Sequence, residues 1–163
     1  MGRADADDLA SVGRAVPMAP SRPKRPRPRP TPPATTPVAV VRAYIGRINA
    51  GDPDGLAKLA AERTRFVDAT GGRFTLSREA WAGYFADFPD YRILVERIFA
   101  HGPRVAVFGV ASGSYRGGGV RTPGAAWRFP AAWSATVRSG KVVEWRVYGD
   151  IEPMLKSAGL GRS

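Results

Sequence analysis

Two alternating segments near the C-terminal end of the sequence constrain the fold more than any other feature. In each segment every second residue is apolar, which is the period of a β-strand with one buried face. A Ser139-Gly140 pair separates the segments and is typical of a hairpin turn. The apolar positions are Trp127, Phe129, Ala131, Trp133, Ala135 and Val137 in the first segment, and Val143, Trp145 and Val147 in the second.

A long hairpin of this kind needs a layer of other elements to cover its apolar face. Further strands are expected at about 91–100 and 104–115, on either side of a turn that contains Gly102 and Pro103. Pro130 interrupts the longer alternating segment and predicts a bulge or an edge there. We therefore expect an α+β fold, in which helices cover the concave face of a strongly curved, mostly antiparallel sheet.

Helical periodicity supplies the covering layer. Apolar residues from Val40 to Ile48 predict a helix that ends near Gly51, and Asp52 predicts the start of a second, short helix. Ser77 is an expected N-cap for a third helix. A last short helix is expected over 151–158. The third helix has an aromatic stripe that favours core packing and is also compatible with a pocket wall: Trp81, Tyr84, Phe85 and Phe88.

The basic residues divide between two parts of the chain. Residues 1–37 hold nine of the fifteen prolines, and seven Lys and Arg against three Asp, a net charge of +4. We expect them to form a disordered Pro/Arg-rich tail. Residues 38–163 hold eighteen Lys and Arg against eleven Asp and Glu, a net charge of +7, and are long enough for one domain. A nucleic-acid partner is not favoured, because the tail has no aromatic residue to stack on bases.

Composition also excludes several kinds of site. The chain has no cysteine, so it can form neither a disulfide nor a thiolate metal site, and His101 is its only histidine. We expect no metal and no cofactor. No apolar run approaches the length of a membrane span, and the first thirty residues lack the hydrophobic segment of a signal peptide. A soluble, cytoplasmic protein without a membrane partner is therefore expected.

Tyr44 and Asp68 are the candidates for proton transfer. Tyr44 belongs to the apolar stripe of the first helix, and strand periodicity puts Asp68 on the same face as Phe66. An apolar pocket raises the pKa of a carboxyl group, which makes it a better base, and a buried phenol can donate to an oxygen that becomes negative. The alternative is structural: Tyr44 is a core residue hydrogen-bonded to Asp68, and each group satisfies the other.

The order and spacing of several motifs resemble a known family. Val40-Val41-Arg42-Ala43-Tyr44, Asn49-Ala50-Gly51-Asp52-Pro53-Asp54-Gly55 and Val67-Asp68 are similar to the start of bacterial ketosteroid isomerases. More broadly, the chain resembles the NTF2-like superfamily, which includes SnoaL-type polyketide cyclases and limonene-epoxide hydrolase. The hairpin sequence Gly140-Lys141-Val142-Val143-Glu144-Trp145 extends the resemblance, which covers about residues 38–158.

The resemblance implies an NTF2-like cone with a hydrophobic pocket, Asp68 as base, Tyr44 as oxyanion donor, and a homodimer formed through the exposed face of the sheet. Trp133 stands about where the isomerases carry a second acid. The late strands also lack the inward Arg and Asp residues of the epoxide hydrolases. Neither steroid isomerisation nor epoxide hydrolysis is therefore expected. Cyclisation remains compatible. The expected pocket residues are Phe66, Trp81, Phe85, Phe88, Trp133, Trp145 and Val147.

Two functions of different classes follow. The first is proton transfer on a small hydrophobic carbonyl compound, by isomerisation, cyclisation or a related reaction, with Asp68 as base. The second is a non-catalytic NTF2-like module that binds an apolar ligand or mediates dimerisation. Asp150 lies just before the last helix, where capping is favoured over a catalytic role.

Overall fold

The computed structural model describes residues 35–117 and 126–160. Residues 1–34 of the expected tail lie outside the described residues, and Pro37 is already the first residue of a helix. Six strands form one mixed sheet in the order β2-β1-β6-β5-β4-β3, in which only β1 and β6 are parallel neighbours. The strands are β1 (Ala60–Val67), β2 (Arg73–Leu76), β3 (Arg92–His101), β4 (Arg104–Ser114), β5 (Ala126–Arg138) and β6 (Lys141–Gly149).

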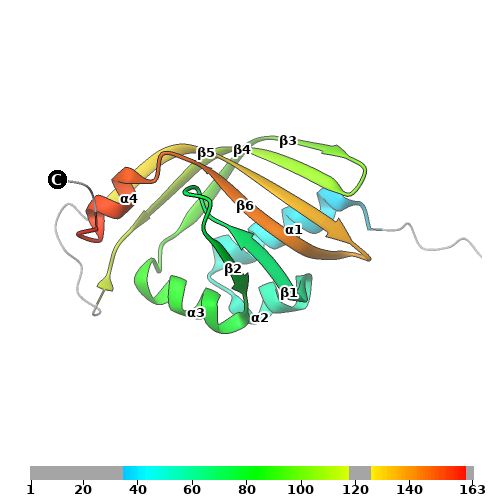
Figure 1. The fold of residues 1–163 in the computed structure, drawn as a ribbon, viewed down its shortest axis with the longest axis horizontal. Helices are drawn as coiled ribbons and strands as arrows, with labels where there is room; N and C mark the ends of the chain where they lie inside the picture. The colour runs from blue at the N-terminus through cyan, green and yellow to red at the C-terminus, as the bar shows by residue number, and fades with distance from the viewer. Residues whose placement is uncertain (1–34, 118–125, 161–163) are drawn as a thin grey trace, which may run out of the picture. The chain divides into compact units, whose positions relative to one another are not determined.

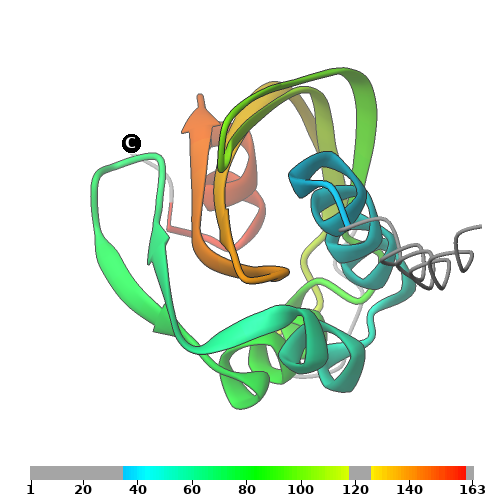
Figure 2. The ribbon, with the colours of Figure 1, turned by 90° about the vertical axis from the view of Figure 1, so that its right-hand side faces the viewer.

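Four helices accompany the sheet: α1 (Pro37–Ala50), α2 (Pro53–Leu59), α3 (Arg78–Asp87) and α4 (Glu152–Ser157). The sheet curves strongly, and α1, α2 and α3 lie on its concave side (Figures 1 and 2). α1 packs against β3, β4, β5 and β6, whereas α3 contacts β2 and α2, and α4 contacts β4 and β5. This arrangement confirms the expected α+β fold with helices over the concave face of a curved sheet.

The β5–β6 hairpin has the expected inward side. Trp133 pairs with Val147, and Ala135 pairs with Trp145, with all four side chains on the inner face. Ser139 and Gly140 have φ of 49° and 72°, the positive values of a type I′ turn, whose twist matches that of the flanking strands. The alternating positions from Trp127 to Val137, with Trp145 and Val147, therefore face inward. The expectation for Val143 is wrong, because the register shifts between Thr136 and Val137, so Val142 is fully buried and Val143 only partly buried.

Pro130 occupies a local edge within an interior strand. β5 lies between β4 and β6, but its pairing with β6 ends at Ala131, opposite Gly149. Pro130 is thus paired only with Val110 of β4, and the strand tolerates its missing N–H where β6 has ended. The bulge in this hairpin lies elsewhere, between Thr136 and Val137.

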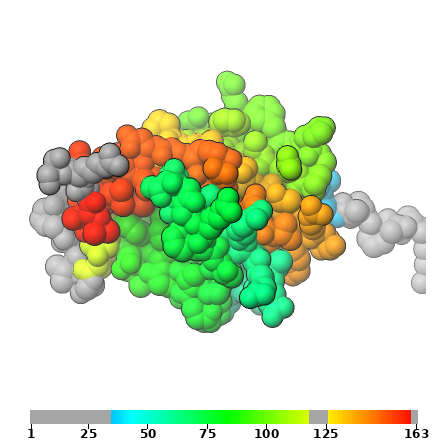
Figure 3. Space-filling model, viewed as in Figure 1, coloured from blue at the N-terminus to red at the C-terminus, as the bar shows by residue number. Residues whose placement is uncertain are grey.

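The turn from Asp68 to Gly72 leads into β2, a short strand that the sequence patterns did not predict. The Asp68 amide donates to the Gly72 carbonyl at 3.0 Å, and β2 then pairs with β1 so that Phe74 lies opposite Phe66. Phe74 is 58% exposed, so this edge strand buries little apolar surface of its own. Figure 3 shows this side of the molecule, with β1 and β2 in green near the centre and α4 in red at the left.

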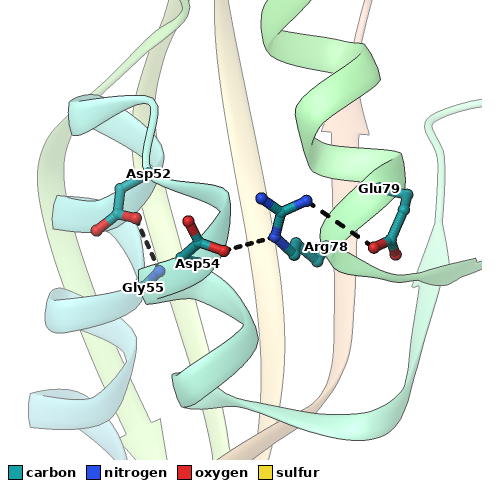
Figure 4. A network of polar contacts seen from close by, with 5 residues as sticks. All are labelled: Asp52, Asp54, Gly55, Arg78 and Glu79. Atoms are coloured by element: carbon teal, nitrogen blue, oxygen red, sulfur yellow. Dashed lines mark hydrogen bonds and ion pairs between the residues drawn. The ribbon is translucent and has the colours of Figure 1, made fainter.

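Short polar contacts fix α2 next to α3. The Asp52 carboxylate accepts a hydrogen bond from the Gly55 amide at 2.8 Å, which is the expected N-cap of α2. Asp54 of α2 then pairs with Arg78 in the first turn of α3, and Arg78 also lies 3.9 Å from Glu79 (Figure 4). Arg78 and Asp54 are exposed, so solvent screens their pair and it contributes little to stability.

Candidate functional site

A cavity of about 500 Å³ lies between the inner face of the sheet, α3 and α4. Five residues expected at a pocket line it: Phe66, Trp81, Trp133, Trp145 and Val147. The exposed ring of Phe74 also lines it, so the cavity opens to solvent beside β2. On the other side, α4 contributes Ile151, Met154 and Leu155.

Two of the expected pocket residues, Phe85 and Phe88, are not among those that line the cavity. Phe85 stacks on Trp81, with ring centroids 5.3 Å apart, and Phe88 contacts Tyr84 and Trp127. Phe88 is the C-cap of α3, with φ of −131°, so its side chain leaves the direction that helical spacing assigns to it. The aromatic stripe of α3 is therefore divided between a cavity wall and the packing behind it.

Asp68 lines the cavity at the end of β1, where its carboxylate also closes a tight turn. Its Oδ1 accepts hydrogen bonds from the Thr70 amide (2.9 Å), the Thr70 hydroxyl (2.7 Å) and the Gly72 amide (2.7 Å). Desolvation is the largest single influence and raises the pKa of Asp68, but the hydrogen bonds from Thr70, Gly72 and Gly71 together outweigh it, and the pKa is lowered.

The raised pKa that we expected for Asp68 is therefore wrong. The expectation considered the apolar surroundings of the carboxyl group but not the donors of its own turn, which stabilise the charged form. Asp68 is an ionised carboxylate at neutral pH, held in one orientation by the backbone.

Tyr44 is fully buried and is not among the residues that line the cavity. Its hydroxyl accepts a hydrogen bond from Trp81 Nε1 at 3.1 Å, and burial raises its pKa to about 12. Among the described residues no hydrogen bond joins Tyr44 to Asp68, so the expected pair is not formed. Tyr44 lies on α1, and its hydrogen-bond partner is the indole of Trp81 on α3 instead of Asp68.

Three polar aromatic residues that were not among the expected pocket residues also line the cavity: Tyr84, Tyr91 and Trp127. Burial raises the pKa values of Tyr84 and Tyr91, so both phenols are neutral. The Tyr84 hydroxyl lies 3.8 Å from Met154 Sδ and links α3 to α4 across the cavity. Trp127 Nε1 is buried and has no hydrogen-bond partner within the described residues. Trp127 shares the inward alternation of Trp133, and that signal could have placed it in the pocket.

Asp150 has a local structural contact and is not a lining residue. Its Oδ1 accepts a hydrogen bond from the Glu152 amide at 3.0 Å, at the start of α4. The N-cap residue itself is Ile151, which makes no side-chain capping bond. Asp150 thus stabilises the first turn of α4 from the position before the N-cap residue.

The charge of the cavity lining is simple. Among the described residues that line the cavity, Asp68 is the only acidic one, and none is Lys, Arg or His. Within residues 35–117 and 126–160, no group of three or more His, Cys, Asp or Glu side chains is arranged to hold a metal ion. In the same part of the chain, none of the helices is both long and apolar enough to cross a membrane.

Comparisons with known proteins indicate a family and show where the same fold occurs. A model of the SnoaL-like domain matches residues 41–145. The fold is similar to that of IdmH, a candidate polyketide cyclase from Streptomyces antibioticus, with 26% identity, a TM-score of 0.59, and coverage of 76% of this chain and 98% of that one. None of the curated protein sequences compared with the chain matches it.

Two further solved structures show the same fold. A candidate SnoaL-like polyketide cyclase from Jannaschia is 20% identical, with a TM-score of 0.64 and coverage of 78% of this chain and 94% of that one. A protein with a ketosteroid isomerase-like fold from Catenulispora acidiphila, in complex with trimethylamine, is 22% identical, with a TM-score of 0.59 and coverage of 74% and 92%.

Proposed function

Because this chain belongs to the SnoaL-like domain family, we propose that it binds a small hydrophobic molecule in the cavity between the sheet, α3 and α4. The observation that carries the proposal is the cavity itself. Its volume of about 500 Å³ lies within the range of small-molecule sites, and its lining is mostly aromatic with few polar groups. The trimethylamine complex of the Catenulispora protein supports small-molecule binding on this fold.

Proton transfer by Asp68 on a hydrophobic carbonyl compound is the second candidate. It is favoured by one observation, the presence of a single carboxylate among the lining residues, and by the polyketide cyclase description of IdmH. Its weakness is the lowered pKa of Asp68, because a more acidic group is a weaker base toward a carbon acid. Tyr44 does not line the cavity, so Asp68 would act without that oxyanion donor. Ligand binding therefore comes first.

A thermal-shift screen of the full chain against steroids, aromatic polyketides and terpene epoxides tests the binding function. A ligand that binds only the folded state raises Tm, by an amount that grows with its concentration. The matched variants are Ala80→Trp, which places a ring in the cavity, and Ala86→Trp, an exposed site on the same helix that does not line it. We expect the first variant to lose the Tm shift and the second to keep it.

Turnover of a ligand found in this screen separates the two candidates. If Asp68 is the base, Asp68→Asn removes turnover while the Tm shift persists, because the substitution keeps the shape of the side chain. If the parent protein binds a ligand but does not convert it, the result favours the non-catalytic function. No Tm shift with any compound class would contradict the proposed function.

The exposed face of the sheet supports the expected homodimer as a further part of this proposal. Leu94, Phe99, Phe108 and Tyr148 are each between 45% and 57% exposed, and they come from β3, β4 and β6. The rings of Phe99 and Phe108 lie 6.2 Å apart. Exposed apolar side chains gathered on one face are typical of an interface between proteins.

Sedimentation velocity of the full chain tests the dimer. We expect a dimer that Phe108→Glu dissociates. The control is Phe74→Glu, since Phe74 is also exposed, at 58% against 47% for Phe108, but lies beside the cavity rather than on this face. A monomeric parent protein at high concentration would contradict the proposal.

A further inference from the structure

We propose that the cavity selects positively charged ligands, namely protonated amines carried on an aromatic or alicyclic body, and that Asp68 is the group that recognises the charge. This inference rests on the proposed function, because it assigns a chemical class to the ligand of the same cavity. The expected carbonyl compound is neutral, whereas the ligand proposed here carries a positive charge.

The described residues that line the cavity carry one formal charge. Asp68 is the one acidic residue among them and none is basic, while the phenols of Tyr84 and Tyr91 are neutral because burial raises their pKa values. This described lining thus has a formal charge of −1 in a chain whose net charge is +11. A single cation complements this charge, whereas an anion is repelled by it.

The Asp68 carboxylate is available to a ligand. No ion pair within the described residues includes it, although the chain is rich in arginine. The three hydrogen bonds from Thr70 and Gly72 all go to Oδ1, so the carboxylate is oriented by its own turn. Oδ2 retains lone pairs for a donor on a ligand, and an ammonium group offers up to three N–H donors.

An aromatic surface lies around this carboxylate. Phe66 precedes Asp68 by two residues and its ring lies 6.3 Å from that of Phe74, and both rings line the cavity. Trp81, Trp133 and Trp145 continue the aromatic lining deeper inside. Aromatic faces attract cations through their quadrupole, and Trp does so best. The same surface accommodates the apolar body of the ligand.

A set of three isosteric probes tests the inference by isothermal titration with the full chain: 2-naphthylmethylammonium, 2-naphthylmethanol and 2-naphthoate. They share one ring system and differ in charge from +1 through 0 to −1. We expect the ammonium compound to bind about two- to fivefold more tightly than the alcohol, the effect of a cation contact at a solvent-exposed site. The carboxylate should bind more weakly than the alcohol.

Asp68→Asn is the decisive variant, because it removes the charge and keeps an acceptor oxygen for Thr70 and Gly72. We expect it to unfold cooperatively in urea, which shows that it is folded, and to lose the preference for the ammonium compound over the alcohol. Arg42→Gln, at an exposed position on α1 that does not line the cavity, is the control for net charge.

The outcomes distinguish this inference from the proposed function. If the parent protein binds the alcohol as tightly as the ammonium compound, the cavity binds small molecules and the inference is overturned. The same conclusion follows if Asp68→Asn keeps the preference. If the parent protein binds none of the three probes, the inference is overturned, while the proposed function is decided separately by the thermal-shift screen.

Discussion

The two halves of the concave face contain similar residues but use them differently. Under α1, Tyr44 is fully buried, its hydroxyl is bonded to Trp81 and its ring lies 5.3 Å from that of Trp145. Under α3 and α4, aromatic side chains of the same kinds surround a cavity of about 500 Å³, and the Tyr84 hydroxyl donates to the Met154 thioether at 3.8 Å.

The difference comes from the covering helices. α1 has fourteen residues and five buried side chains, and it crosses four strands. α4 has six residues, none of them buried, and contacts two strands. A helix this short cannot fill the space above long strands, so the aromatic side chains below it remain a lining and do not become a closed core. Stability is therefore expected to depend on the α1 half, and binding on the other half.

Tyr44→Ala should have the largest effect on stability, because it removes a fully buried ring from the α1 half. We expect a loss of about 3 to 5 kcal/mol in the free energy of unfolding, measured by urea denaturation. The matched variant Tyr84→Ala enlarges a space that already exists, and should cost about 1 to 2 kcal/mol. Equal losses in the two variants would remove the distinction between the halves.

Tyr44→Phe isolates the polar contact in the same half. It leaves the buried Trp81 Nε1 without its acceptor and should cost about 1 to 3 kcal/mol by the same measurement. Tyr148→Phe, which removes a hydroxyl from an exposed ring, should leave the free energy of unfolding within about 0.5 kcal/mol of the parent value. If Tyr44→Phe leaves the free energy of unfolding unchanged, the Trp81 indole must have another acceptor.

Asp150→Ala tests the cavity half with a smaller change. The loss of the hydrogen bond to the Glu152 amide should cost about 0.5 to 1 kcal/mol, because it serves only the first turn of α4. Ligand affinity should stay unchanged, since Asp150 does not line the cavity. Loss of affinity together with retained stability would instead give Asp150 a role in binding.

The smallest expected effect is the acid dependence due to Asp68. Its pKa is lower in the folded chain than the unfolded value of about 3.9, so its ionised form stabilises the fold above about pH 4. This contribution is lost as pH falls through the lowered folded pKa. The difference in Tm between the parent protein and Asp68→Asn should narrow over that range. Asp52, whose pKa is also lowered, is present in both proteins, so its contribution cancels in the difference in Tm. A constant difference would contradict the lowered pKa.

Local patterns in the sequence were sufficient for the elements and for the inward side of the sheet. The alternation through Trp133 and Trp145, the Ser139-Gly140 turn, and the caps Asp52 and Ser77 all depend on neighbours within a few residues, and the structure confirms each of them. The same kind of reasoning put Phe66 and Asp68 on one face of a strand, and both line the cavity.

Only the tertiary structure decided what lies opposite each inward side chain. Periodicity shows that Tyr44 points inward, but not that an indole from α3 would be its partner instead of Asp68. It also leaves unspecified the backbone path from Asp68 to Gly72, which aims two amides at the carboxylate and lowers its pKa. Side-chain direction is a local property of the backbone, whereas hydrogen-bond partners, pKa values and empty space depend on which distant segments meet.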